Sequence, residues 1–267
     1  MRSSSGPVRL ARLWAAVFST SLRRELAFRT DLLFQLLAAL TGAAAGLAAL
    51  GAVYAQTASL AGWSAGEAIV LFGTFQVLSG LRAALVEPNV GWFRSQVVEG
   101  KLDDVLLKPV PSVLLATLGT CAPIALLPAL VGLGVVGLGL HELGRGPSPL
   151  AVLGWLSLIA DAAVVTWATR VVLASLTFWA PDATRDVLYD ALWQLGRYPV
   201  EIHRQPLRFV VTYVLPVALV ASLPAAALTR GVTLLPLGLG LAAAAAAAVA
   251  ASLVWRAGLR RYTSATS

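Results

Sequence analysis

Few side chains in this sequence have the types and spacing that catalysis needs. The chain has one cysteine, Cys121, and two histidines, His141 and His203, which excludes a disulfide framework and a multi-cysteine metal site. It contains no G-x-x-x-x-G-K-[ST] nucleotide loop, no G-x-S-x-G and no H-E-x-x-H. We therefore expect no catalytic centre of these classes, no metal and no cofactor bound by this chain.

Asp161 is the ionisable residue that most needs an explanation. It follows Ser148 and Pro149, a helix-start pair, by twelve residues, which places it about 18 Å into an apolar run, near the middle of a bilayer. Arg170 lies half a helical circle away, so the two side chains cannot pair on a regular helix. Either Asp161 faces a substrate path or a subunit seam, or it is hydrogen-bonded to Ser157 or a neighbouring helix. Gln76 and Thr120 are the other candidates for a substrate path.

Composition indicates where these side chains must be held. The chain is 58% hydrophobic with a mean hydropathy of +0.79, and apolar runs of roughly 20 residues, enough to span a bilayer, recur about six times. We predict an all-α membrane protein in which residues 1–267 form one domain with six transmembrane helices. The net charge of +7 is spread over short segments between the runs, so no nucleic-acid partner is expected.

The N-terminal segment 8–28 has an amphipathic pattern. Its apolar side chains recur at helical spacing and its arginines lie largely off that stripe. We predict a helix on the inner membrane surface, where arginines meet anionic lipid headgroups. The alternative is a plain extension of the first span.

Local signals divide the remaining runs. Ser64 and Glu67 form a capping box before the second span. The third run, 112–140, contains two prolines and is expected to tilt or kink. The fourth, 149–180, is too long for one straight span, so it either continues past the interface or breaks near Arg170. The last two predicted spans are 209–228, which is interrupted by prolines, and 232–255, which is rich in small residues.

The distribution of arginine and lysine predicts the orientation. Sixteen of the twenty basic residues fall in the N-terminal segment, the loop after the second span, the predicted loop 181–208 and the C-terminal tail, against two in the alternate loops. By the positive-inside rule both termini are cytoplasmic.

Residues 90–110 form a dense polar segment between two spans. Phe93, Val97, Leu102 and Leu106 belong to an apolar stripe at helical spacing, and Gly100 marks a break between two short helices. A charged stretch of this kind is usually a solvated face. Because its net charge is neutral and not lipid-seeking, docking on a protein partner is the favoured interpretation.

Five stretches of the sequence resemble a known family. They are EGKLDDVLLKPV (99–110), FW (178–179), LGRYPVEIH (195–203), LRFVVTYVLPVA (207–218) and SLPAAAL (222–228). In order and spacing the chain resembles the permease subunits of the bacterial type-2 ATP-binding-cassette exporters over nearly its whole length.

The resemblance implies a permease of the bacterial plasma membrane that exports a hydrophobic or amphipathic solute. Two copies of a separate ATP-binding subunit would hold ATP and Mg, and a second permease chain, identical or similar, would complete the assembly. Segment 90–110 would couple the ATPase to the spans through Arg94, Val97, Glu99, Gly100, Lys101, Leu102, Asp103, Asp104, Leu106 and Lys108, the apolar members filling a groove on the ATPase. A second, smaller cytoplasmic contact would involve Arg197, Tyr198, Pro199 and Glu201; the alternative is a turn anchored at the lipid headgroups by its tyrosine.

Two other classes of function remain open at this point. One is a membrane-integral enzyme acting on lipids, with Asp161 as its acid. The other is a scaffold or assembly factor without transport activity.

Overall fold

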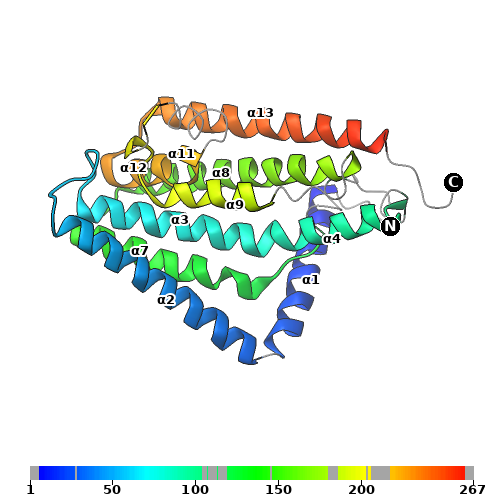
Figure 1. Cartoon of the computed structure of the whole chain (residues 1–267), viewed down its shortest axis with the longest axis horizontal. Helices are drawn as coiled ribbons and strands as arrows, with labels where there is room; N and C mark the ends of the chain where they lie inside the picture. The colour runs from blue at the N-terminus through cyan, green and yellow to red at the C-terminus, as the bar shows by residue number, and fades with distance from the viewer. Residues whose placement is uncertain are drawn as a thin grey trace.

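The structure, a computed structural model, describes residues 6–27, 29–103, 107, 113, 119–144, 146–179, 186–202, 204–205 and 217–261. Within these residues there is no β-strand, and most of the long helices run in roughly one direction, with one long helix inclined to them (Figure 1). Five helical stretches of the described chain are long and apolar enough to cross a membrane: Thr30–Tyr54, Ala65–Val97, Pro123–Glu142, Pro149–Phe178 and Leu234–Leu259. The predicted all-α membrane fold is confirmed.

Two helices begin where the sequence predicts. α3 (Ala65–Leu85) starts with the full capping box of Ser64 and Glu67. α8 (Pro149–Ser175) starts at Ser148, whose hydroxyl accepts a hydrogen bond from the Ala151 amide. Both caps satisfy backbone donors that a helix start would leave unpaired in lipid.

α3 continues almost directly into α4 (Glu87–Val98), and this defines the two ends of the bundle. From Ser64 to Glu99 the rise is about 52 Å at 1.5 Å per residue, more than the roughly 30 Å of hydrocarbon in a bilayer. α4 therefore extends beyond the membrane. We call the two ends of this long helix the Trp63 end and the Glu99 end.

α1 (Gly6–Leu26) crosses the Glu99 end of the bundle at a steep angle to the other helices (Figure 1). Its Arg23 and Arg24 are exposed. Glu25 accepts a hydrogen bond of 2.8 Å from the Ile124 amide and so ties α1 to the start of the third span. The orientation agrees with the predicted interfacial helix, and α2 (Arg29–Tyr54) then runs toward the Trp63 end.

The third span is shorter than the sequence predicts. Residues 119–122 are non-helical, and the helix begins only at Pro123 with the 3-10 turn η1 (Pro123–Leu126), which leads into α7 (Leu127–Glu142). Proline disfavours helical geometry in the residue before it, and Ala122 is accordingly outside the helical region at φ −119° and ψ 84°. The helix of the third span therefore begins at Pro123. The sequence predicted one tilted or kinked span that starts at residue 112.

The fourth span is unbroken. α8 passes through Arg170 without interruption and ends in the 3-10 turn η2 (Leu176–Phe178). Of the two alternatives predicted for this long run, the structure shows the helix continuing past Arg170.

α3 and α7 pack through a seam of glycines. Gly66, Gly73 and Gly80 recur every seventh residue of α3 and face Gly132 and Gly139 of α7. A Cβ atom on Gly73 would lie 2.7 Å from the Val136 backbone nitrogen, and one on Gly139 would lie 2.8 Å from the Gly66 carbonyl oxygen. Only glycine allows the two backbones to come this close. Such close packing stabilises helix pairs in a membrane, where the hydrophobic effect does not drive helices together.

The segment after α8 returns along α3. It comprises α9 (Asp186–Gln194), η3 (Leu195–Arg197) and η4 (Val200–Ile202). Its contacts move step by step toward the Trp63 end, and the pairs are Asp190 with Arg82, Trp193 with Ser79, Arg197 with Phe75, and Glu201 with Trp63. Residues 186–202 therefore run antiparallel to α3 for about 28 Å, close to a bilayer thickness.

This path differs from the predicted topology. The sequence predicted a cytoplasmic loop at 181–208 and a fifth span at 209–228, whereas the described part of that loop runs along the bundle between its two ends. Most of the predicted fifth span, 209–216, lies outside the described residues.

The chain then re-enters the bundle before α13 (Leu234–Leu259). α11 (Val217–Val220) lies at the depth of Asp161, since Leu219 and Asp161 both face Gly240 of α13. α12 (Ser222–Arg230) leads from there to the Trp63 end, where Arg230 meets Glu67. α11 and α12 thus occupy only the Trp63 half of the bundle (Figure 1).

Candidate functional site

A cavity with a mixed polar and apolar lining lies between α2 and the returning segment 186–202, with α3 as its floor. Its volume is about 590 Å³, within the range of small-molecule sites. The lining alternates small and aromatic side chains with polar ones; the polar and aromatic members are Gln35, Phe72, Phe75, Gln76, Ser79, Arg82, Trp193, Gln194, Arg197 and Tyr198. We call this cavity the α2–α9 groove.

Two polar side chains of the groove lack partners among the described residues. The Nε2 atom of Gln76 is buried without a hydrogen-bond acceptor. Arg197 is exposed and stacks on Phe75, with its guanidinium carbon 5.6 Å from the ring centroid, and the described chain provides no ion pair for it. Donors without acceptors inside a membrane bundle are typical of a binding site.

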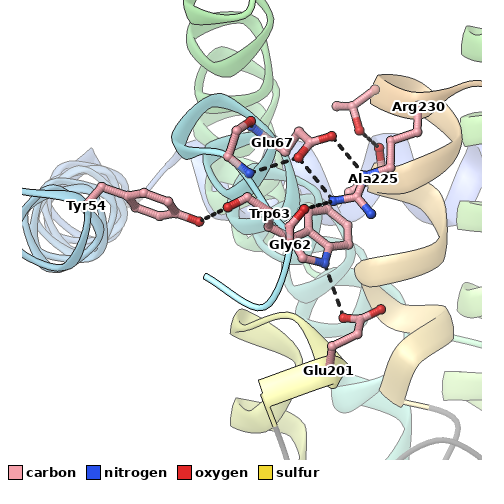
Figure 2. Close-up of polar contacts among 9 residues, drawn as sticks. Tyr54, Gly62, Trp63, Glu67, Glu201, Ala225 and Arg230 are labelled. Carbon is pink, nitrogen blue, oxygen red and sulfur yellow. Dashed lines mark hydrogen bonds and ion pairs between the residues drawn. The ribbon is translucent and has the colours of Figure 1, made fainter. Parts of the chain in front are cut away.

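A hydrogen-bonded cluster closes the Trp63 end (Figure 2). Arg230 donates to both carboxylate oxygens of Glu67, at 2.8 and 3.1 Å, and lies over the Trp63 ring at 4.2 Å. The Trp63 indole donates to Glu201 at 3.2 Å, and the Tyr54 hydroxyl donates to the Trp63 carbonyl at 2.9 Å. The hydrogen bonds to Glu67 raise the pKa of Arg230. This cluster joins α2, α3, η4 and α12 above the groove.

A second charged network lies toward the Glu99 end. Glu87 accepts from Arg170 at 2.6 Å and lies 3.5 Å from Arg82, which also pairs with Asp190 at 2.9 Å. The guanidinium groups of both arginines lie over the Tyr189 ring. The network joins α3, α4, α8 and α9. It gives Arg170 a carboxylate partner, Glu87, whereas the sequence analysis established only that Arg170 does not pair with Asp161.

The three residues predicted for a substrate path have different positions. Gln76 lines the α2–α9 groove. Asp161 does not, because it is 9% exposed and its carboxylate faces Gly240 of α13. Thr120 does not either: its amide and hydroxyl donate to Asn89, and its carbonyl accepts from the Asn89 side chain. The Asn89 side chain thus satisfies the backbone amide and carbonyl of Thr120 at the break before Pro123.

The predicted coupling segment is partly as expected. Gly100 ends α4 with a positive φ of 67°, and the Lys101 amide donates to the Gln96 carbonyl at 2.9 Å, which closes the turn. Lys101 and Glu99 form an exposed pair at 2.7 Å that raises the pKa of Lys101. Leu107 is 83% exposed. Asp104, Leu106 and Lys108 lie outside the described residues.

The apolar part of that segment needs a correction. Phe93 and Leu102 are fully buried and pack with Trp255 of α13 in the core of their own chain. Leu102 therefore cannot fill a groove on a partner. Apolar periodicity predicted the stripe but could not distinguish a partner from the last span of the same chain.

The residues predicted for a second cytoplasmic contact lie along α3 and at the Trp63 end of the bundle. Arg197 and Tyr198 line the α2–α9 groove, Pro199 is fully buried, and Glu201 bonds to Trp63. They are separated from Glu99 by most of the length of the bundle, so the two predicted contacts do not form one surface.

Sequence reasoning missed the glycine seam that packs α3 on α7 and the groove itself. The glycine seam was visible as a seven-residue repeat in two apolar runs. The groove was not visible, because its polar residues come from helices that are distant in the sequence and pair only through the returning segment.

Comparison with known proteins agrees with this architecture. Residues 40–266 match the family model described as ABC-2 family transporter protein. Neither the curated proteins nor the solved structures compared with the chain give a match. Since the family model covers all five long apolar helices apart from the start of α2, this multi-pass membrane chain belongs to the ABC-2 family of transporter membrane proteins.

Proposed function

We propose that this ABC-2 permease exports a hydrophobic or amphipathic solute through the α2–α9 groove, driven by ATP hydrolysis on a separate subunit. The groove carries the proposal: it is a cavity inside a membrane bundle that combines unpartnered donors with aromatic and small apolar walls. In this proposal the cluster around Trp63, whose hydrogen bonds join helices on both sides of the Trp63 end, acts as the closure of the groove on that side. Rearrangement of that cluster would open the groove on the Trp63 side.

The Glu99 end is the proposed cytoplasmic, ATPase-facing end. It holds α1, α4 and the end of α13, with exposed basic side chains at Arg23, Arg24 and Arg256, as the positive-inside rule requires of a cytoplasmic face. Among the described residues of the coupling segment, the exposed Glu99–Lys101 pair and Leu107 are available to an ATP-binding subunit. Two such subunits, a second permease chain beside the groove and a bacterial plasma membrane complete the proposal.

Affinity purification tests the partnership. The tagged chain is isolated from gently solubilised native membranes, and Mg-dependent ATP hydrolysis is measured in the eluate. We expect ATPase activity to co-purify, and Lys101→Glu to reduce it by about tenfold at equal chain recovery, since an interfacial charge contact is worth roughly 1.4 kcal/mol or more. Arg256→Glu, a reversal at the same end but outside the coupling segment, should have little effect.

An eluate without ATPase activity would contradict the proposed partnership. Equal losses for the two variants would instead remove the coupling role of residues 99–107. The lipid-enzyme alternative gains no support, because Asp161 lies against Gly240 and outside the groove.

A further inference from the structure

Arg197 is placed where an arginine is costly. It stacks on Phe75, eleven residues after Ser64, which is about 16 Å from the Trp63 end and near the middle of a hydrocarbon core roughly 30 Å thick. An arginine side chain is too short to reach the headgroups from that depth. Charged residues in such positions face a cavity and act on a substrate or ion.

The described part of the chain provides no carboxylate for this charge at that depth. Among the described residues, Asp161 is the one acidic residue near the middle of the bundle, and it faces Gly240 on the other side of α8. The Arg82–Asp190 and Arg230–Glu67 pairs show how the chain neutralises its other arginines near this groove. A second copy of the chain would bring, from its described spans at this depth, only the carboxylate of its own buried Asp161.

Other hydrogen-bond donors line the same groove as Arg197. Gln76 is 91% buried with an unpartnered Nε2, while Gln194 and Tyr198 line the same wall as Arg197. Phe72, Ala43 and Gly46 provide an adjoining apolar surface. An anion would satisfy the guanidinium and the amide together, since charge-assisted hydrogen bonds are the stronger class.

From this arrangement we propose that the α2–α9 groove binds an amphipath with an anionic head, a phosphate, sulfate or carboxylate, which Arg197 and Gln76 hold while its apolar body lies against α2. That the bound amphipath is the transported solute rests on the proposed function, whereas its binding in the groove does not.

Binding of a labelled probe tests the inference. The full chain is reconstituted in phosphatidylcholine nanodiscs, and saturable binding of dodecyl phosphate and of dodecyltrimethylammonium is measured above that of empty nanodiscs. We expect the anion to bind at least about tenfold more tightly than the cation with the same tail, because the site offers a cation and amide donors.

Variants then test the assigned residue. Arg197→Gln should weaken dodecyl phosphate binding by about tenfold or more, Arg197→Lys should weaken it less, and Arg256→Gln, which removes an exposed arginine at the end of α13, should leave it unchanged. The lysine variant and the comparison of head groups on the unaltered chain remain informative if Arg197→Gln fails to fold.

Repeating the titration in nanodiscs that contain phosphatidylglycerol distinguishes two sources of the anion. Displacement of dodecyl phosphate assigns the site to a lipid headgroup, and retained binding assigns it to a separate solute. Equal affinity for anion and cation, or equal losses in Arg197→Gln and Arg256→Gln, would overturn the proposal. Failure to recover an ATPase would remove the transport role and leave the binding result standing.

Discussion

At the scale of residues, the charged side chains inside this bundle fall into two groups. Most are arginines matched to carboxylates from distant helices, as in the Glu87 network and the Trp63 cluster. Among the described spans, Arg197 is matched to no carboxylate, and Asp161 is matched to no arginine. Sequence analysis identified Gln76 and the capping role of Glu67. It could not find the pairs Arg170–Glu87, Arg82–Asp190 and Arg230–Glu67, because their members lie 83 to 163 residues apart.

Removal of the shared carboxylate should be costly. Glu87→Gln leaves Arg170, whose side chain is 5% exposed, and Arg82 without their common partner. We expect a loss of about 3 kcal/mol in the free energy of unfolding, the cost of breaking a buried pair. Unfolding in mixed micelles by sodium dodecyl sulfate measures it.

Glu99→Gln is the matched control. It removes the same charge from an exposed pair with Lys101, so its effect should stay within about 0.5 kcal/mol. Similar losses in the two variants would contradict the structural role assigned to Glu87.

At the scale of elements, helix starts were predictable and helix ends less so. Ser64 and Ser148 are local caps, and their hydrogen bonds depend only on the next three residues. The break before Pro123 depends on Asn89, which lies thirty-one residues before Thr120. The Asn89 side chain forms the hydrogen bonds that the non-helical backbone of Thr120 needs. A local pattern cannot reveal such a partner.

The glycine seam gives a sharp prediction on one helix. Gly139→Val should destabilise the chain by about 2 kcal/mol or more, because its side chain would collide with the α3 backbone. Gly137→Val, two residues away and facing open space, should be tolerated. Thermal unfolding in detergent, followed by tryptophan fluorescence, compares the two, and equal melting temperatures would argue against the seam.

At the scale of the whole molecule, the main difference from the predicted topology is the returning segment 186–202. It carries Asp190, Arg197 and Glu201, so a hydropathy criterion favours the more apolar run that follows. Asp190 and Glu201 are nevertheless accommodated because Arg82 and Trp63 meet them. Hydropathy measures a segment alone, whereas the cost of these charges depends on the bundle around them.

Cysteine labelling tests this topology. In a Cys121→Ser background, single cysteines are placed at the exposed positions Ser59, Lys101 and Gln205, and a membrane-impermeant maleimide is added to either side of sealed vesicles. We expect Ser59→Cys and Gln205→Cys to label from one side and Lys101→Cys from the other. Labelling of Gln205→Cys together with Lys101→Cys would restore the loop that the sequence predicted.

The central claim is that an ATP-binding chain docks on the coupling segment at the Glu99 end. A photoreactive amino acid at Leu107, which is 83% exposed, tests it most directly, with the same residue at Leu138, 57% exposed on α7, as the control. Illumination of native membranes followed by mass spectrometry should give a cross-link from position 107 to a nucleotide-binding subunit and none from position 138. Cross-links from position 107 to lipid alone, or to the same subunit from both positions, would contradict the account.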